Sequence, residues 1–428
     1  MTKPAPADDA KVGLVMVGLV STEPSLEEFE REAVAFLDAR ATRRADHRQP
    51  WGQGSDRVGL FEEKTREQEL AELAAAQAWK SQVFDAGFGW LTGPTAYGGR
   101  ALPAEYERRW QSVQARYDVP PTTVFAIGLG MVAPTILAHG SDVAKESYLR
   151  ALHRGDVVGC QLFSEPGAGS DLASLQTRAV RDGDVWIVNG QKVWTSGAQF
   201  SDIGEILCRT DPDVPKHKGI TGFLVDMRAP GVEVRPLRQM TGGASFNEVF
   251  FTDVVVPDDH RLGDVNGGWS VALTTLMNER AAIGGGAAGG VSFGLARLTE
   301  LLRHLGREQE PLLRQQLADL WINVHVARFT NLRAMEKLQA GQIPGPELSI
   351  AKLALTNNLQ LISKFLSSVL GNRLVADTGE WGTYAWAELV LGVPGFRVAG
   401  GTDEVLRNII GERVLGLPKE PRAAAPTS

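Results

Sequence analysis

The most informative stretch of this chain is Ser164-Glu165-Pro166-Gly167-Ala168-Gly169-Ser170-Asp171, which is followed by Gln191-Lys192-Val193-Trp194-Thr195-Ser196-Gly197-Ala198. The proline and glycines keep the first segment out of regular structure, so backbone N–H groups and serine hydroxyls are free to bind an anionic or carbonyl-rich ligand. The second segment presents an indole beside two hydroxyls, which suits a flat heteroaromatic ring with polar edges. Either segment alone fits an ordinary turn or a core aromatic. The pair predicts a cofactor site.

A dinucleotide-binding interpretation of Gly167-Ala168-Gly169 is weaker. The third glycine of the G-x-G-x-x-G pattern is replaced by Leu172, and no βαβ pattern surrounds the segment. A plain Rossmann site is therefore not expected.

The periodicity of apolar residues changes along the chain. From about Leu26 to Arg154 they recur at spacings of three and four, which predicts helices. Near Val157 the period becomes that of strands, and from about Trp269 the helical period returns. Within the strand region, Val185–Trp194 is interpreted as two strands joined by an Asn-Gly turn. Further strands are expected over Gly219–Asp226, Val232–Pro236 and Glu248–Pro257.

These periods predict an α+β fold that is mainly α and has three domains. An N-terminal helical domain is expected over residues 1–156, a β-barrel-like domain over 157–264 and a C-terminal four-helix bundle over 265–428.

Composition narrows the functional class. The 428 residues are 43% hydrophobic and 22% charged, with a formal net charge of −7, and no basic run indicates a nucleic-acid partner. Cys160 and Cys208 have no metal-ligand spacing, so neither a disulfide framework nor a metal site is expected. The apolar run Val12–Val20 is shorter than a membrane span and lacks signal-peptide flanks, so we expect a cytoplasmic protein without a membrane span.

Two further segments are candidates for the site. Asn278-Glu279-Arg280 precedes the small-residue run Ala281–Gly290, which would let a backbone or a flat ligand approach closely. Gly400-Gly401-Thr402-Asp403-Glu404 is expected to begin the last helix, with Thr402 as its N-cap, and to leave N–H groups able to touch a ligand.

Together these segments resemble the acyl-CoA dehydrogenase family, and the actinobacterial type most of all. The likeness extends over the helix–β–helix order, Tyr97-Gly98-Gly99 and the Arg407–Pro418 tail. It implies FAD as cofactor, an acyl-CoA substrate and a trans-2-enoyl thioester product. The residues implied to bind FAD are Gln161, Leu162, Phe163, Ser164, Gly169, Ser170, Trp194, Thr195, Ser196, Thr402 and Glu404. Those implied to line the path of the thioester are Ser170, Met277, Asn278, Arg280, Gly400 and Gly401.

The resemblance also assigns the base. The family removes the substrate α-proton with a glutamate while the β-hydrogen leaves as a hydride to flavin N5. The usual glutamate directly precedes the Gly-Thr of the last motif, where this chain has Gly400. A branch similar to isovaleryl- and long-chain-acyl-CoA dehydrogenases carries it immediately before the helix arginine. Glu279 fills that position, so it is the implied catalytic base, with Arg280 as its orienting partner and an electron-transferring flavoprotein as oxidant.

Two departures from the family pattern concern the subunit contact. The Arg-x-x-Phe-Gly segment that reaches a neighbouring subunit's FAD is replaced by Gly306–Pro311, and the neighbour-contacting Gln with its Gly-Gly by Ser368, Gly371 and Asn372. A heterotetramer with a sister subunit is therefore an alternative to a homodimer or homotetramer. Two other functions stay open: a non-catalytic subunit that completes another chain's site, and a flavin oxidase or monooxygenase on the same scaffold.

Overall fold

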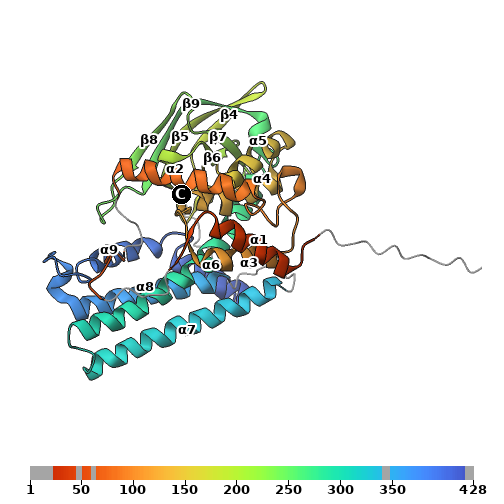
Figure 1. Ribbon diagram of the computed structural model, residues 1–428. Coiled ribbons are helices and arrows are strands. Elements are labelled where there is room, and N and C mark those ends of the chain that lie inside the picture. The colour runs from red at the N-terminus through yellow and green to blue at the C-terminus, as the bar shows by residue number, and fades with distance from the viewer. Residues whose placement is uncertain (1–22, 45–50, 59–63, 340–347, 420–428) are drawn as a thin grey trace, which may run out of the picture.

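The computed structural model describes residues 23–44, 51–58, 64–339 and 348–419. A sheet domain lies above a layer of long helices, and the shorter N-terminal helices flank both (Figure 1). The mainly helical α+β fold expected from the sequence is confirmed. The Val12–Val20 run lies outside the described residues.

The N-terminal part is helical because each helix has an apolar face and most have a local start signal. Ser25 and Glu28 form a capping box at the start of α1, whose Phe29, Ala33 and Leu37 are buried at the expected spacing. A π-helical turn over Gly128–Val132 leads into α4. The helices are α1 Leu26–Asp38, α2 Arg66–Asp85, α3 Ala104–Gln114, α4 Ala133–His139 and α5 Asp142–Arg154, with the short strands β1 Thr42–Arg43 and β2 Tyr117–Asp118 paired antiparallel.

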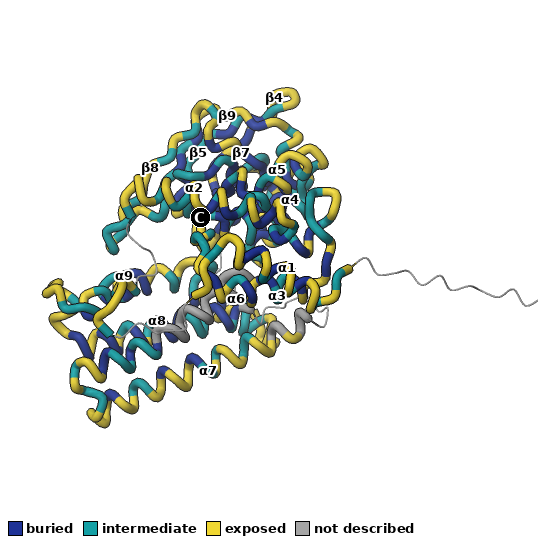
Figure 2. Tube along the Cα trace, in the orientation of Figure 1, coloured by how far each residue is buried: buried dark blue, intermediate teal, exposed yellow. Residues whose placement is uncertain are grey.

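The middle part is an eight-stranded sheet in the order β10-β7-β6-β4-β5-β9-β8, with β3 pairing in parallel with β6. The sheet encloses an apolar core that includes Leu162, Trp186, Ile206 and Phe251. Buried segments make up the dark interior of the upper part of Figure 2. The strands are β3 Gly159–Leu162, β4 Arg178–Asp182, β5 Val185–Ser196, β6 Ile203–Arg209, β7 Ile220–Asp226, β8 Val232–Leu237, β9 Phe246–Pro257 and β10 Arg261–Leu262.

The expected turn at Asn189-Gly190 is wrong. Both residues lie inside the continuous strand β5, and the chain reverses before it, at Gly183 with φ +61°. Asn189 bonds across the sheet to Asp253, accepting from its N–H at 2.9 Å and donating to its Oδ1 at 3.0 Å. Gly190 is needed because a Cβ there would meet Thr177 at 2.4 Å. The Asn-Gly pair therefore marks an irregularity in a strand pair and not a hairpin.

Two bulges interrupt the pairing of β5 with β9. From Val188 to Gly190, β5 advances by two residues while β9 advances by three. Closer to the carboxyl end of β5, from Lys192 to Thr195, β5 advances by three while β9 advances by two. The second bulge contains Trp194, which has a left-handed φ of +62°. A bulky residue in that conformation stores strain, which is often found at functional sites.

The C-terminal part consists of long helices packed around a leucine-rich core. Leu298 and Leu302 of α6, Leu320 of α7, and Ile362 and Leu366 of α8 are buried together. Leu359 and Val369 of α8 are buried at matching helical spacing, so α8 presents one apolar face to this core. The outward side of α7 is largely exposed (Figure 2). The helices are α6 Gly268–His304, α7 Pro311–Gln339, α8 Leu348–Leu370, α9 Trp386–Phe396 and α10 Asp403–Ile409.

Candidate active site

The signature loop, residues 163–171, leaves the end of β3. Phe163 is buried between the sheet and α6, in one cluster with Ala168, Leu172 and Ala272. Glu165 and Ala168 bond to each other in both directions, N–H to carbonyl, at 3.0 and 3.1 Å. This closed turn projects the exposed residues between them away from the core, as expected for a ligand-binding loop.

A buried ion pair fastens this loop to the second segment. Lys192 has no exposed surface, and its Nζ donates to Glu165 Oε1 at 2.8 Å and to the Phe163 carbonyl at 3.1 Å. The Glu165 carboxylate also accepts from the N–H groups of Gln176 at 2.6 Å and Thr177 at 2.9 Å. Burial on its own raises the pKa of Glu165, but Lys192 and these donors outweigh it, so the pKa is lowered and the carboxylate stays ionised. The pair holds both sequence segments in one place.

The second segment meets the loop directly. The Val193 N–H donates to the Ser164 carbonyl at 2.9 Å. The next residue, Trp194, is 58% exposed and its ring lies edge-on to Phe246, with centroids 6.0 Å apart. Thr195 is buried, and its hydroxyl has no hydrogen-bond partner among the described residues. A buried hydroxyl of this kind is costly unless a ligand supplies the partner.

These residues fit the cofactor that the sequence implies. The ideal Cβ positions of Gly167, Gly169 and Gly197 have no atom within 4 Å, so the space around both segments is open. The exposed Trp194 ring and the orphaned Thr195 hydroxyl match a flat ring system with polar edges. Gln161 and Ser164 are half-buried, and Ser170 is exposed.

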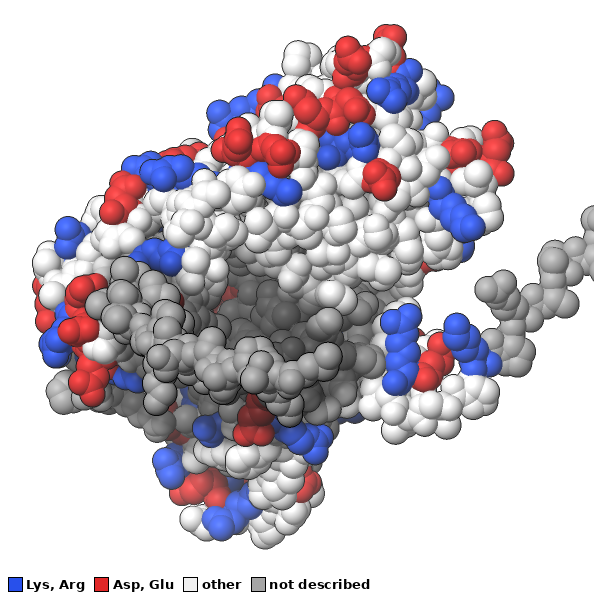
Figure 3. Space-filling model, turned by 90° about the vertical axis from the view of Figure 1, so that its right-hand side faces the viewer, with Lys and Arg blue, Asp and Glu red and all other residues white. Residues whose placement is uncertain are grey.

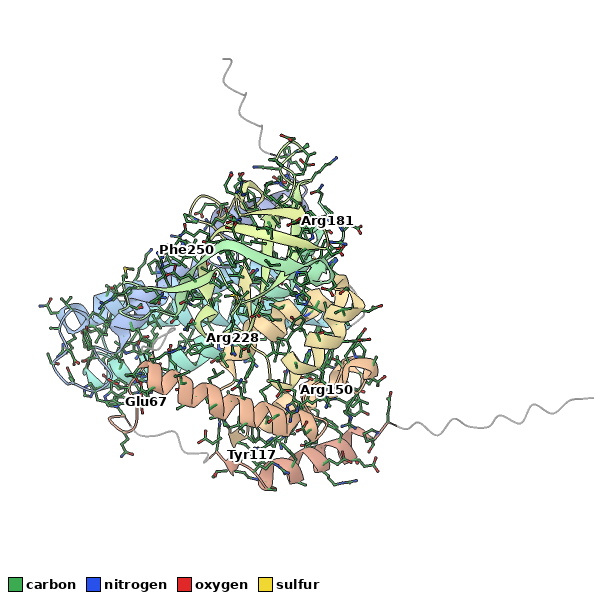
Figure 4. All side chains as sticks on the ribbon, turned by 90° about the horizontal axis from the view of Figure 1, so that it is seen from above. Glu67, Tyr117, Arg150, Arg181, Arg228 and Phe250 are labelled. Carbon is green, nitrogen blue, oxygen red and sulfur yellow. The ribbon has the colours of Figure 1, made fainter. Side chains whose placement is uncertain are left out.

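A cavity of about 640 Å³ adjoins this segment. Its walls come from the start of α2, the loop after β5, strand β8 and the loops on either side of β8, and they include Arg66, Phe200, Arg228 and Ser245. Figure 4 shows Arg228 where α2 faces the sheet. Asn247, also in this wall, donates to the Thr195 carbonyl at 3.1 Å, so the cavity and the second segment share a residue.

Helix α6, which carries the candidate base Glu279, packs against the signature loop. Ala272 and Leu276 pack in the same cluster as Phe163, and Glu279 follows Ala272 by seven residues, which places it on the same face of the helix. Glu279 is half-buried. Met277 is 50% exposed and Asn278 donates to the Thr274 carbonyl at 3.1 Å. The side chain of Arg280 lies outside the described residues.

The turn before the last helix is held from α8. Thr402 caps α10 as expected, accepting from the Val405 N–H at 3.2 Å. Gly400 and Gly401 have φ values of +66° and +88°. Lys352 donates to the Gly401 carbonyl at 2.7 Å. Among the hydrogen bonds of the described residues, none joins this turn to the signature loop.

Asp403, the first residue of α10, also binds Lys352 and helps to hold the turn before this helix. Asp403 is buried and accepts from Thr356 Oγ1 and Arg397 Nε, both at 2.8 Å, and from Lys352 Nζ at 3.3 Å. Glu404, by contrast, is exposed and lies 3.7 Å from Arg397 and Arg407.

The two segments that depart from the family pattern meet in space. Arg307, in the connection between α6 and α7, donates to the Val369 carbonyl of α8 at 3.0 Å, and its guanidinium also binds Glu310. Ser368 bonds back to the Phe365 carbonyl at 2.8 Å. The departures therefore form one local surface at an end of the helical layer.

Sequence reasoning missed the buried polar residues that shape the site. No role was expected for Glu165, Lys192, Lys352 or Asp403, nor for Glu205, an acid buried beneath α6. A lysine in the apolar run Val185–Trp194 was a usable signal, because a lysine at a core position needs a partner.

In residues 23–44, 51–58, 64–339 and 348–419, no group of three or more His, Cys, Asp or Glu could hold a metal ion. The helices of this part of the chain include none long and apolar enough to cross a membrane. Basic and acidic side chains are interspersed on the face in Figure 3, without a patch of one sign.

Comparison with known proteins identifies the family. The N-terminal, middle and C-terminal domains of acyl-CoA dehydrogenases match residues 58–156, 160–254 and 266–415. Acyl-CoA dehydrogenase FadE34 of Mycobacterium tuberculosis is 42% identical over 354 residues, covering 82% of this chain but 48% of the relative, so this chain spans about half its length. Acyl-CoA dehydrogenase IpdE1 of the same organism is 36% identical, with 80% of this chain and 88% of the relative covered.

Solved structures agree. The Tcur3481-Tcur3483 steroid ACAD matches with a TM-score of 0.72 and 26% identity, over 93% of this chain and 99% of that chain. The ChsE4-ChsE5 complex from Mycobacterium tuberculosis matches with a TM-score of 0.66 and 28% identity, over 94% and 100%. The resemblance drawn from the sequence is confirmed: this chain belongs to the acyl-CoA dehydrogenase family and is an FAD-dependent oxidoreductase of the actinobacterial type.

Proposed function

We propose that this chain converts an acyl-CoA thioester to the trans-2-enoyl-CoA, with Glu279 as the base. The observation that carries the proposal is the buried Lys192–Glu165 pair, which joins both signature segments. The loop that it fastens packs, through Phe163 and Ala168, against Ala272 and Leu276 on the α6 face that bears Glu279. FAD, when bound, supplies the acceptor for the hydride that leaves the substrate β-carbon.

The protein residues have distinct tasks. The signature loop and the segment from Trp194 to Ser196 hold the cofactor, with Thr402 and Glu404 as further contacts. The Glu279 carboxylate takes the α-proton of the thioester, and Arg280 orients it. Gly400 has no side chain to act as a base, so it and Gly401 contribute backbone N–H groups that polarise the thioester carbonyl and acidify the α-carbon.

The assembly is part of the proposal. The match to this chain covers only 48% of FadE34, and the ChsE4-ChsE5 structure is a complex of two named components. The Arg307–Val369 surface carries both departures from the family's subunit-contact pattern. We infer that a sister subunit completes the cofactor contacts at this surface, forming a heterotetramer. The similarity to a steroid ACAD, at 26% identity, also suggests a steroid-like acyl group as substrate.

The oxidant and the location complete the proposal. An electron-transferring flavoprotein would reoxidise the reduced enzyme in the cytoplasm. We also propose that the three domains meet near residues 156 and 264.

An anaerobic titration of the FAD-loaded protein with a panel of acyl-CoAs tests this function, with flavin absorbance as the readout. General-base catalysis is worth about 10²–10⁴-fold, so Glu279→Gln should retain FAD but lose most flavin bleaching. Glu300→Gln, on the same helix, is the matched control and should bleach like the wild type. Bleaching that survives in Glu279→Gln would refute the assignment of the base.

The subunit proposal has a separate test. The chain should bind FAD weakly and bleach slowly alone, and gain both properties when co-expressed with a sister chain. Full FAD occupancy and activity of the chain on its own would refute the need for a partner.

A further inference from the structure

A buried carboxyl group lies where the sheet meets α6. Glu205 lies on β6, opposite Gln161 in the backbone register of the neighbouring strand β3, and has no exposed surface. Its Oε1 lies 2.6 Å from Thr275 Oγ1 of α6. Thr275 Oγ1 in turn lies 2.9 Å from Thr135 Oγ1 of α4. Thr135 donates to the Met131 carbonyl in the π-helical turn at 2.8 Å. One chain of contacts therefore connects the sheet, α6 and α4.

A proton on Glu205 satisfies every contact of this chain. Each threonine has a single hydroxyl proton. Thr135 can give its proton to the Met131 carbonyl, and Thr275 can then give its own proton to Thr135 or to the Val271 carbonyl at 3.2 Å. In that arrangement the contact between Glu205 and Thr275 takes its proton from the carboxyl group.

An ionised Glu205 would change this pattern. Thr275 would donate to the carboxylate, and Thr135 would turn its proton from the Met131 carbonyl to Thr275. No salt bridge to Glu205 is formed within the described residues, and its Oε2 has no hydrogen-bond partner there. A buried, unpaired charge is far more costly than an unpaired carbonyl oxygen.

The bond to Thr275 lies close to the candidate base. Thr275 precedes Glu279 by four residues, one helical turn, on the same side of α6. Ala272 and Leu276 pack that side through apolar contacts, which are not directional. A hydrogen bond is directional, so it fixes the rotation of the helix against the sheet.

We propose that Glu205 is a positioning residue of the active site: as a neutral acid it donates to Thr275 and thereby fixes the turn of α6 from which Glu279 reaches the substrate. This inference rests on the role of Glu279 given in the proposed function.

The surroundings of Glu205 agree with a neutral group. Burial raises the pKa of Glu205 to about 8, against a smaller lowering by Thr275. Titratable side chains on the elements around it include Glu279 of α6, His139 of α4, Asp226 of β7, Cys160 of β3, and Cys208 and Arg209 of β6. Within the described residues, none of these forms a hydrogen bond with Glu205. His139 bonds to Thr274 at 2.8 Å, and burial lowers its pKa. Glu205 therefore loses its proton, and α6 its anchor, as the pH rises through about 8.

The test compares FAD-loaded wild type with Glu205→Gln, Thr275→Val and Thr299→Val. The amide introduced by Glu205→Gln can donate to Thr275 without titrating. Thr275→Val removes the acceptor and keeps the shape. Thr299 is the matched control, because it lies on α6 and donates to the Leu295 carbonyl of its own helix at 3.1 Å.

Two readouts are measured: the infrared C=O band of a protonated acid in H₂O and D₂O, and the pH profile of kcat/KM with butyryl-, octanoyl- and palmitoyl-CoA. The wild type should show the band at neutral pH and lose activity above pH 8, whereas Glu205→Gln should show neither. Thr275→Val should lower kcat about 10- to 100-fold through misplacement of the base, with unchanged FAD content, while Thr299→Val should leave it unchanged.

Each opposite result overturns the inference: no band in the wild type, the same high-pH decline in Glu205→Gln, or equal rates in Thr275→Val and Thr299→Val. Failure of the proposed function is seen separately, as Glu279→Gln bleaching like wild type or as no bleaching with any acyl-CoA. In that case the infrared comparison alone decides whether Glu205 is the neutral donor to Thr275.

Discussion

Lys192 and Glu165 form a buried ion pair, with Nζ and Oε1 2.8 Å apart, between two segments that are separated in sequence but joined at the candidate cofactor site. The lysine also donates to the backbone of the signature loop at Phe163. A loop that must stay open to a ligand cannot be fixed by packing on its exposed side. The buried ion pair on its inner side holds it instead.

Removing the cation should therefore affect both stability and cofactor binding. Lys192→Met leaves Glu165 buried without its partner, which should cost about 3–5 kcal/mol of unfolding free energy and much of the FAD. Urea unfolding and the flavin absorbance of the purified protein measure the two effects. Glu233→Gln, which breaks an exposed pair with Arg235, should cost less than about 1 kcal/mol. Equal losses in both variants would contradict the structural role of the buried pair.

Replacing Thr195 should have different effects on the stability of the FAD-free protein and on the affinity for FAD. Its buried hydroxyl has no partner among the described residues, so Thr195→Val should leave the FAD-free protein as stable or slightly more stable. If FAD supplies the partner, the variant should bind FAD about 5- to 10-fold more weakly, which corresponds to one lost hydrogen bond. Thermal unfolding of the free protein and FAD titration separate these effects. Unaltered FAD affinity would mean that this hydroxyl faces away from the cofactor.

Asp403 should make stability depend on pH in the acid range. Burial alone would raise the pKa of Asp403, but Arg397, Thr356 and Lys352 outweigh it and lower the pKa. A lowered folded-state pKa stabilises the fold above the unfolded value of about 3.9, and this stabilisation is lost as the pH falls through the folded value. Asp403→Asn should be less stable than wild type by about 1–3 kcal/mol at neutral pH, and the difference should shrink below about pH 4.

Urea unfolding at several pH values measures that difference. Asp377→Asn is the control, because Asp377 is exposed and its carboxylate accepts from the N–H of Gly379. A gap between wild type and Asp403→Asn that stays constant under acid conditions would contradict the prediction.

Gly190 should be intolerant of a methyl group. Its Cβ would meet Thr177 Oγ1 at 2.4 Å, so Gly190→Ala should cost about 1–3 kcal/mol or more through overpacking. Gly167→Ala meets no atom within 4 Å and should be close to neutral in stability. Chemical denaturation of both variants checks this contrast, and a neutral Gly190→Ala would show that β4 and β5 can separate at little cost.

Local signals explain what could be predicted from the sequence. Thr402 caps its helix through a bond to a residue three positions away, and the apolar spacing of Phe29, Ala33 and Leu37 describes one helix face. The signature segments identified the family because their order and composition are specific to it. None of these inferences needed knowledge of distant contacts.

The features that could not be predicted depend on contacts between residues that are far apart in the sequence. Asn189-Gly190 has the composition of a hairpin turn, but Asp253, in another strand, decides its conformation. Glu205 is buried because Thr275, seventy positions further along, provides its hydrogen bond. Lys192 faces inward in step with Trp186 and Val188 of the same strand, but the groups that bind it, the Glu165 carboxylate and the Phe163 carbonyl, come from another segment of the chain. A single sequence does not contain these pairings, so the roles of these residues emerge from the structure.

The two irregularities in the β5–β9 pair also constrain how this region can change in length. The extra residue of β9 is cancelled by the extra residue of β5, so both ends of the pair share one alignment while Gly190–Lys192 alone follow another. Deleting either extra residue would turn the side chains beyond it to the opposite face of the sheet. Single insertions or deletions in this strand pair should therefore abolish cofactor binding. Matched changes, one in each strand, should be tolerated in the evolution of this site.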